Sequence, residues 1–250
     1  MTSLIGNTMI ILLVCGDYRL HSPMYFFVAN LSFLEVAITS TVVPKMLANT
    51  FSDTKAISFV GCLTQSFFYF LLGSTESFIL AVMSFNQYIA ICNPLSTINL
   101  NWVSALLWAK YNQSLFLLKL VCADISLAEL PDFISSAVLL LGSLLLTGVS
   151  YMYIIITILR IPSVQGRQKA FSTCVSHITV VTLYYGSSIF IYVRPKKGNV
   201  LDVNKFATVL NTIVTPMLNP FIYSLRNEKV KESLRDAFNK YIGKFKIFEI

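Results

Sequence analysis

Apolar segments of membrane-spanning length, separated by short polar loops, make up most of the chain. An α-helix rises 1.5 Å per residue, so about 20 apolar residues are needed to cross a bilayer. The pattern predicts spans over 1–15, 23–47, 58–85, 133–159, 171–193 and 206–225, and a weak one over 100–110. The first span and the weak one are short for a full crossing. The pattern therefore predicts an all-α integral membrane protein, a single domain over 1–250 that forms a seven-transmembrane helix bundle with an incomplete first and fourth helix.

The segment after the last span mixes charged and apolar residues at helical spacing. Its apolar positions are Val230, Leu234, Ala237, Phe238 and Tyr241. Apolar residues that recur every three or four positions form one face of a helix. We therefore expect an amphipathic helix over 227–241 that lies on the membrane surface.

Composition and charge support a membrane protein. Only 12% of the residues are charged, about half the share found in soluble domains. The net charge of +7 does not indicate nucleic acid, because the basic residues lie in loops between apolar segments. Such loops face the cytoplasm by the positive-inside rule, which places Arg19, 160–169 and 226–235 on that side. The basic loop 194–205 argues against this orientation. The orientation also requires that residues 102–109 cross or half-cross the membrane.

The sequence offers little catalytic or metal-binding chemistry. It contains five scattered cysteines without a C-x-x-C pair, which argues against a disulfide scaffold or a zinc site. We find no nucleophile–base pair, no glycine-rich phosphate loop and no carboxylate dyad, so we expect no enzyme. His177 lies in an apolar segment and the only other histidine is His21. An interior histidine is therefore favoured over a metal ligand.

Two acids, Glu35 and Glu76, lie deep inside apolar segments. A carboxylate within a membrane is costly and tends to mark a functional interior. Together with Asn7 and Asn219, these acids form a candidate site for a sodium ion or for a shared proton. The alternative is that each acid hydrogen-bonds to a neighbouring helix. A sodium ion is the one cofactor that we consider.

The last span contains a proline three residues, or about one helical turn, before a tyrosine, in the order Asn219-Pro220-Phe221-Ile222-Tyr223. A proline inside a helix frees a backbone carbonyl and permits a kink. Such a position suits a helix that moves between two states, although a static kink remains the alternative.

The residues 83–95 read MSFNQYIAICNPL. This stretch resembles the cytoplasmic end of the third helix of odorant receptors, where the family pattern is M-A-x-D-R-Y-x-A-I-C-x-P-L. Five more stretches resemble the same family in the same order: LHSPMYFF at 20–27, LSFLE at 31–35, VPKML at 43–47, KAFSTCVSH at 169–177 and PMLNPFIYSLRN at 216–227. On these six motifs the chain is similar to the odorant receptors, a branch of the rhodopsin-like G-protein-coupled receptors.

The resemblance implies a multi-pass plasma-membrane receptor that binds a small odorant and couples to a heterotrimeric G protein of the stimulatory olfactory type. Its pocket should lie in the outer half of the bundle, as an apolar cavity with a few polar groups. Candidates by helix position are Phe70, Gly73, Ser74, Ser77, Tyr184, Tyr185, Ser188 and Thr208. Since Glu76 is the only ionisable residue nearby, we expect a neutral, mostly hydrophobic ligand. Each candidate could instead be an ordinary packing residue.

The chain departs from the family where signalling is expected. Asn86 and Gln87 stand in place of the acid and the arginine. Both amides can hydrogen-bond but carry no charge, so we expect weak coupling. The implied switch residues are Asn86, Gln87, Tyr88, Pro220 and Tyr223.

The fourth span and the long second extracellular loop of the family are largely absent, and so is the glycosylated N-terminal tail. Asn112 stands where the family has the cysteine that bridges to the third helix, represented here by Cys62. Cys62 and Cys122 are therefore candidates for a disulfide, with free thiols as the alternative. Asn112 also begins a glycosylation sequon, Asn112-Gln113-Ser114.

Two other functions are alternatives to an odorant receptor. A shortened copy, impaired in signalling and retained in the endoplasmic reticulum, would show the same motifs. A transporter or channel would show inverted repeats and broken helices near the midplane, and the sequence shows neither.

Overall fold

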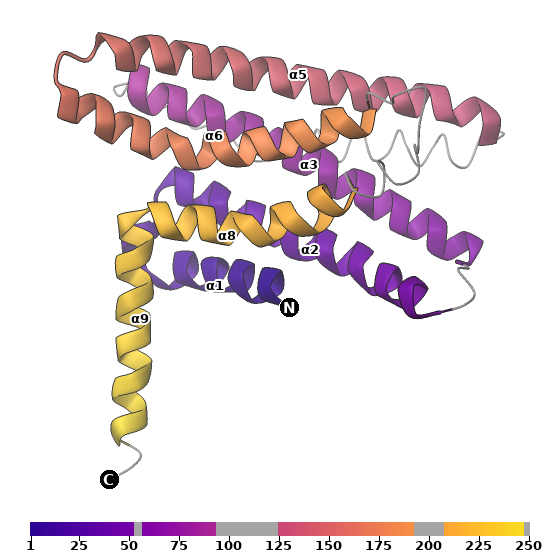
Figure 1. Cartoon of the computed structure of the whole chain (residues 1–250), viewed down its shortest axis with the longest axis horizontal. Helices are drawn as coiled ribbons and strands as arrows, with labels where there is room; N and C mark the ends of the chain where they lie inside the picture. The colour runs from indigo at the N-terminus through magenta and orange to yellow at the C-terminus, as the bar shows by residue number, and fades with distance from the viewer. Residues whose placement is uncertain (53–56, 94–124, 193–207, 248–250) are drawn as a thin grey trace. The chain divides into compact units, whose positions relative to one another are not determined.

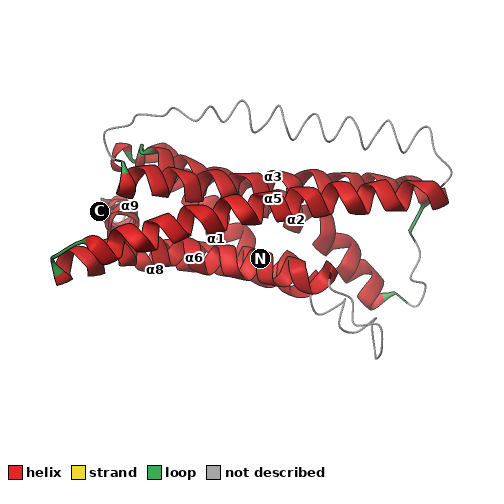
Figure 2. Cartoon of the chain, turned by 90° about the horizontal axis from the view of Figure 1, so that it is seen from above, coloured by secondary structure: helices red, strands yellow, loops and turns green. Residues whose placement is uncertain are grey.

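A computed structural model of the chain describes residues 1–52, 57–93, 125–192 and 208–247 (Figure 1). Within these ranges all regular structure is helical (Figure 2). The elements are α1 (Thr2–Gly16), η1 (Tyr18–Leu20), α2 (Pro23–Phe51), α3 (Phe59–Cys92), α5 (Ile125–Arg160), α6 (Val164–Tyr192), η2 (Leu210–Val214), α8 (Thr215–Arg226) and α9 (Glu228–Ile247). The all-α class is thus confirmed.

Three of the described helices are long and apolar enough to cross a membrane: α2, α3 and the Val138–Arg160 part of α5. Helix α1 is apolar but has only 15 residues. It is therefore about 22 Å long, which is less than the roughly 30 Å of a hydrocarbon core. This agrees with the prediction of an incomplete first helix. The predicted weak span at 100–110 lies outside the described residues.

Local capping explains several helix boundaries. Helix α2 begins at Pro23. Proline is tolerated at the first position of a helix, because an N–H at that position would have no acceptor within the helix. The Ser58 hydroxyl accepts a hydrogen bond from the Gly61 N–H at 3.1 Å and starts α3. The Ser163 hydroxyl does the same for the Gly166 N–H at 3.0 Å. Because Ser163 caps the helix, α6 begins seven residues before the predicted apolar span at 171.

The described helices form two compact units, and each is described by itself. We call Met1–Val36 with Phe171–Ile250 the terminal unit, and Ala37–Ala170 the central unit. In the terminal unit, α1 packs against α8, and α9 packs against α8, α1 and η1. In the central unit, α3 and α5 pack along each other (Figure 2). The single domain over 1–250 stays a prediction.

A glycine permits the close contact between α1 and α8. A β-carbon on Gly6 would lie 3.0 Å from the Cβ and 3.1 Å from the Cγ of Pro220. A side chain at position 6 would therefore fit only if Pro220 gave way by a few tenths of an ångström. This contact brings the next residue of α1, Asn7, into the interior, where it is fully buried.

The last predicted span is not a uniform helix. A π-helical turn, η2, covers Leu210–Val214 and runs directly into α8. Pro216 has no N–H for the carbonyl four residues earlier, so the regular ladder is interrupted at this place. The Thr215 hydroxyl donates to the Leu210 carbonyl at 3.1 Å, which satisfies one group of the widened turn. Such π turns often accompany functional sites.

The tail helix extends further than predicted, over Glu228–Ile247 rather than 227–241. Figure 1 shows α9 leaving α8 at a sharp angle. The corner is Asn227, whose backbone is extended. Its side-chain oxygen accepts hydrogen bonds from the Tyr25 hydroxyl at 2.8 Å and from the Lys229 N–H at 3.1 Å. Asn227 therefore caps α9 and ties the corner to α2.

Candidate functional site

The proline in α8 is matched by an amide from α1. Because Pro220 has no N–H, the carbonyl of Pro216, four residues earlier, loses its helical donor. The Asn7 side-chain nitrogen donates to this carbonyl at 2.9 Å and also to the Ser3 carbonyl at 3.0 Å. An unpaired buried carbonyl would cost about 1–3 kcal/mol. Asn7 thus compensates for the proline, and it connects α1 to the part of α8 predicted to kink.

A second buried contact joins α2 to α8. The Asn219 side-chain nitrogen donates to the carboxylate of Glu35. Both residues are almost fully buried, with 2% and 1% of their surface exposed. The structure therefore brings Glu35, Asn219 and Asn7, three of the four residues of the predicted sodium or proton site, into the terminal unit. The fourth, Glu76, is buried in the central unit.

The oxygen atoms of this site suit a small hard cation. The side-chain oxygens of Asn7 and Asn219 are buried and have no hydrogen-bond partner among the described residues. Glu35 adds a carboxylate, the only acid in the described α1, α2 and α8 segments of the terminal unit. Carboxylate and amide oxygens are ligands for hard cations, whereas histidine and cysteine favour transition metals. The residues present are thus compatible with sodium.

The predicted coupling residues on α3 lie against α5. Gln87 is 4% exposed, and its side-chain oxygen accepts a hydrogen bond from the Tyr151 hydroxyl at 2.8 Å. The Gln87 amide nitrogen has no partner among the described residues. Asn86, next to it, is half-buried. A neutral hydrogen bond between α3 and α5 thus stands where the family pattern has an arginine.

The contact between α3 and α5 continues for one more turn. The rings of Tyr88 and Tyr153 lie 5.8 Å apart. The Cys92 sulfur lies 3.1 Å from the Thr157 hydroxyl. The partners on α5 could not be predicted from the pattern, because each is one polar residue in a long apolar segment. The remaining predicted switch residues, Pro220 and Tyr223, are buried in α8.

The predicted ligand-binding residues are divided between the two units. Phe70, Gly73, Ser74 and Ser77 lie on α3 in the central unit. The hydroxyls of Ser74 and Ser77 both donate to backbone carbonyls of α3 itself, those of Phe70 and Gly73. A β-carbon on Gly73 would meet no atom within 4 Å, so there is open space beside this helix.

In the terminal unit, Tyr184, Tyr185 and Ser188 are buried on α6, whereas Thr208 is exposed. The rings of the two tyrosines are 5.2 Å apart and nearly perpendicular. The structure adds two residues that we did not predict, Ser187 and Asn211. Their side-chain oxygens lie 3.1 Å apart and connect α6 to η2. The only amide in an otherwise apolar stretch, Asn211, was the available signal for this contact.

Two predictions concern Asn112, Cys62 and Cys122. Asn112 and Cys122 lie outside the described residues. Cys62, at the start of α3, is exposed and forms no disulfide with a described residue. The pairing of Cys62 with Cys122 and the glycosylation of Asn112 therefore stay predictions.

His177, predicted to be an interior histidine, is fully buried on α6.

The loop after α1 is joined to α9 by charged groups. The Arg19 guanidinium contacts the carboxylates of Asp17 and Asp236, each at 2.7 Å. Hydrogen bonds from Arg19, followed by one from Ser233, hold the pKa of Asp17 well below its usual range. The same bonds to Asp17 and Asp236 raise the pKa of Arg19. The loop and α9 are thus connected by the ion pair between Arg19 and Asp236.

We expect Arg19→Ala to loosen α9, seen as faster hydrogen–deuterium exchange of the amides at 228–239. The effect should shrink as salt rises, because exposed ion pairs are screened. Because the pKa of Asp17 is lowered in the folded chain, Asp17 stabilises the fold fully above the unfolded carboxyl pKa of about 4. This stabilisation is lost as the pH falls further. The difference from the unaltered chain should therefore stay constant between pH 5 and pH 7.

Lys231→Ala is the matched control for Arg19→Ala. It removes the ion pair with Glu228 at 2.8 Å, which lies within α9 and does not reach the loop. Equal exchange rates in the two variants would show that Arg19 does not hold α9 in place.

The fold is that of the rhodopsin-like seven-helix receptors. The crystal structure of squid rhodopsin matches with a TM-score of 0.74 over 96% of this chain and 82% of that chain, at 16% identity. The family model of the olfactory receptors matches residues 1–107 and 101–240. The chain belongs to the olfactory receptor family.

Individual relatives agree with this assignment. The chain is 45% identical to olfactory receptor 6S1 of Homo sapiens, over 96% of this chain and 83% of that protein. It is 45% identical to olfactory receptor 6E1 of Mus musculus, over 95% of this chain and 87% of that protein. The chain is therefore a multi-pass membrane protein of a receptor family, and the expectations of a G-protein-coupled receptor and of no enzyme are confirmed. A transporter or channel has no support.

The comparison also supports an internal shortening. The alignment to the human relative extends over 274 positions, more than the 250 residues of this chain. That relative thus contains internal residues without a counterpart here. The family model matches the chain in two segments, which overlap at residues 101–107. This overlap lies inside the region predicted to lack most of the fourth helix.

Proposed function

We propose that the protein is an odorant receptor at the plasma membrane. It binds a small, neutral, mostly hydrophobic ligand within the helix bundle and signals through a heterotrimeric G protein of the stimulatory olfactory type. The observation that carries this proposal is the olfactory receptor match over residues 1–107 and 101–240.

The terminal unit supports the chemistry proposed for the ligand. Its candidate wall on α6 consists of aromatic rings and hydroxyls, Tyr184, Tyr185 and Ser188, all buried. None of these side chains carries a charge at neutral pH. Apolar walls with a few hydrogen-bonding groups are the usual design of small-molecule sites. A neutral ligand with one hydroxyl or carbonyl group would suit such a wall.

We also propose a sodium or proton site formed by Asn7, Glu35 and Asn219 in the terminal unit, while a part for Glu76, in the central unit, stays a prediction. Glu35 and the two asparagines supply oxygens in the interior of the terminal unit. A sodium ion bound there would neutralise the buried carboxylate. The asparagine amides would keep their nitrogen contacts to Glu35 and to the Pro216 carbonyl, so the site would favour one position of α8 over another.

A second function remains in competition: a shortened copy that is retained in the endoplasmic reticulum and signals poorly. The uncharged pair Asn86 and Gln87 favours it, as does the internal shortening near 101–107. The two proposals differ in surface expression and in ligand-dependent cAMP.

The test is a cAMP assay on cells that express the tagged full chain, exposed to a panel of neutral hydrophobic volatiles. We expect at least one ligand to raise cAMP, and Tyr185→Ala to weaken its potency by about tenfold or more, since a buried aromatic contributes about 1.5–3 kcal/mol. Tyr18→Ala, at an exposed loop tyrosine, is the control and should leave potency unchanged. A chain that reaches the surface and responds to no ligand contradicts the proposal.

Glycosidase digestion of the same tagged chain separates the two functions. Glycans on Asn112 that mature to resist the high-mannose-specific enzyme indicate export to the surface. Glycans that stay sensitive, with no surface signal, favour the retained copy.

A further inference from the structure

A buried serine lies in the charged helix α9. Ser233 is the only serine of α9, and it is 3% exposed. Among the described side chains of α9, the other buried one is Val230, three residues earlier. Residues three apart in a helix share a face. Val230 and Ser233 therefore mark the face by which α9 docks on the rest of the terminal unit.

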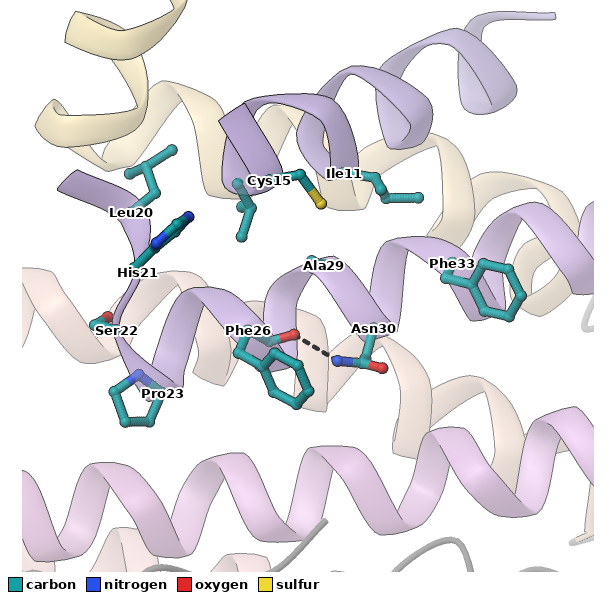
Figure 3. A pocket seen from close by; sticks show the side chains of 11 residues that line it. Ile11, Cys15, Leu20, His21, Ser22, Pro23, Phe26, Ala29, Asn30 and Phe33 are labelled. Atoms are coloured by element: carbon teal, nitrogen blue, oxygen red, sulfur yellow. Dashed lines mark hydrogen bonds between the residues drawn. The ribbon is translucent and has the colours of Figure 1, made fainter. Parts of the chain in front are cut away.

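This face of α9 meets the loop that joins α1 to α2. Helix α9 packs against η1 in that loop, and Leu20 of η1 is fully buried. Figure 3 shows Leu20 and His21 at the loop end of a cavity between α1 and α2. Just before η1, the Asp17 carboxylate accepts a hydrogen bond from the Ser233 hydroxyl. Ser233 is thus a polar group within the contact between α9 and the loop.

The charges around Ser233 suit a neutral hydroxyl. The Arg19 guanidinium is shared by two carboxylates, those of Asp17 and Asp236, each at 2.7 Å. Asp236 lies three residues after Ser233, on the same side of α9. A phosphate on Ser233 would add about 1.5 to 2 negative charges beside Asp17. Like-charge repulsion and loss of the buried hydrogen bond would then both favour release of α9 from the loop.

The contact is weak enough to open and expose the serine. The Arg19 and Asp236 side chains are 38% and 60% exposed, and exposed ion pairs contribute little to stability. Elements that are held by few buried groups open locally while the rest of the protein stays folded. Of the described α9 side chains, only Val230 and Ser233 are buried, so α9 is an element of this kind.

The sequence around Ser233 carries cations on both sides. Lys229 and Lys231 precede the serine and Arg235 follows it. Kinases discriminate among substrates by such charge patterns, and this one suits a kinase with an acidic peptide groove. The basic residues of the tail also place it on the cytoplasmic side of the membrane, where ATP is available.

We propose that Ser233 is a phosphorylation site at which a basophilic serine kinase releases α9 from the loop. The kinase transfers the γ-phosphoryl group of ATP to the Ser233 oxygen. The bond from the γ-phosphorus to ADP breaks, the bond to the serine oxygen forms, and the hydroxyl proton passes to a base of the kinase. The phosphate then repels Asp17, while the corner at Asn227 still joins α9 to α8 and α2. This inference depends on neither the odorant nor the G protein.

The test treats the full chain in lipid nanodiscs with ATP and protein kinase C, a basophilic serine kinase, and follows the peptide that contains Ser233 by mass spectrometry. We expect one phosphate on Ser233. Its addition should be about two- to fivefold faster in Arg19→Ala, which loses the ion pair to Asp236 and opens more often. Tyr18→Ala is the matched control, because Tyr18 is exposed in the same loop, and it should leave the rate unchanged. Phosphate on Ser233 in neither the unaltered chain nor Arg19→Ala overturns the proposal.

Hydrogen–deuterium exchange measures the release of α9 itself. Phosphorylation should speed exchange of the amides at 228–239 about fivefold or more, since it removes the Ser233 hydrogen bond and adds repulsion. Kinase and ATP should leave exchange in Ser233→Ala unchanged. Ser233→Glu should exchange faster than Ser233→Gln, because the two side chains have nearly the same shape and only glutamate adds a charge beside Asp17. A chain that carries phosphate on Ser233 and exchanges at the unmodified rate overturns the proposal.

Discussion

The double variant Asn86→Asp with Gln87→Arg is expected to raise ligand-induced cAMP about tenfold over the unaltered chain at equal surface expression. Hydrogen bonds to charged groups contribute up to about 1.5 kcal/mol beyond neutral ones, and about 1.4 kcal/mol corresponds to a tenfold change in an equilibrium. In the family pattern the arginine reaches the G protein and the acid restrains it. Asn86 and Gln87 carry no charge, so they can neither make a charged contact to the G protein nor form a charged restraint.

The structure explains why the arginine should be accommodated. Gln87 already lies buried against α5, with the Tyr151 hydroxyl at 2.8 Å from its oxygen. A hydroxyl can accept as well as donate, so it can turn to accept from a guanidinium. The Gln87 nitrogen has no partner among the described residues, which shows that the amide does not fully satisfy this position.

The single variants separate the two roles. Gln87→Arg alone should raise basal cAMP, because the arginine lacks its restraining acid. Asn86→Asp alone should leave the response low. If the unaltered chain already signals as strongly as the double variant, the uncharged pair does not limit coupling.

The helical class followed from segment length and composition, because a bilayer imposes both on any chain that crosses it. Local effects were also accessible: Pro220 predicted a freed carbonyl, and the structure shows that carbonyl at Pro216. What the pattern could not show is the donor. Asn7 is 209 residues away in sequence from Pro216, and only the packing of α1 on α8, allowed by Gly6, brings them together.

The missed features share a cause. The Ser187–Asn211 contact and the Tyr151–Gln87 contact each join two segments whose polar residues are isolated in apolar surroundings. Helical periodicity assigns a residue to a face but does not give the rotation of one helix against another. The cavity between α1 and α2 was missed for the same reason, since its lining residues are ordinary apolar positions in each segment taken alone.

Sodium is expected to stabilise the purified receptor, and Glu35→Gln is expected to remove this effect. At ten times its Kd, a ligand that binds only the folded state adds about 1.4 kcal/mol. For a chain of this size that is a rise of about 3–6 °C in the melting temperature. The measurement compares sodium chloride with choline chloride at the same ionic strength, so that general screening is equal.

The amide in Glu35→Gln keeps an oxygen that can accept from Asn219 but has no charge to attract the ion. Its melting temperature should therefore be the same in both salts. Glu35→Ala goes further, because it leaves the buried Asn219 nitrogen without its acceptor and should cost about 1–3 kcal/mol in either salt. Glu228→Gln, at an exposed acid on α9, is the control that keeps the sodium response.

A shared proton makes the opposite prediction for the same variants. The unaltered receptor would then melt at the same temperature in sodium and choline, and would become more stable as pH falls, because protonation removes the buried charge. Glu35→Gln would mimic the protonated acid and lose that pH dependence. The salt comparison at two pH values thus decides between cation and proton at Glu35, and a receptor that responds to neither binds no cation and shares no proton there.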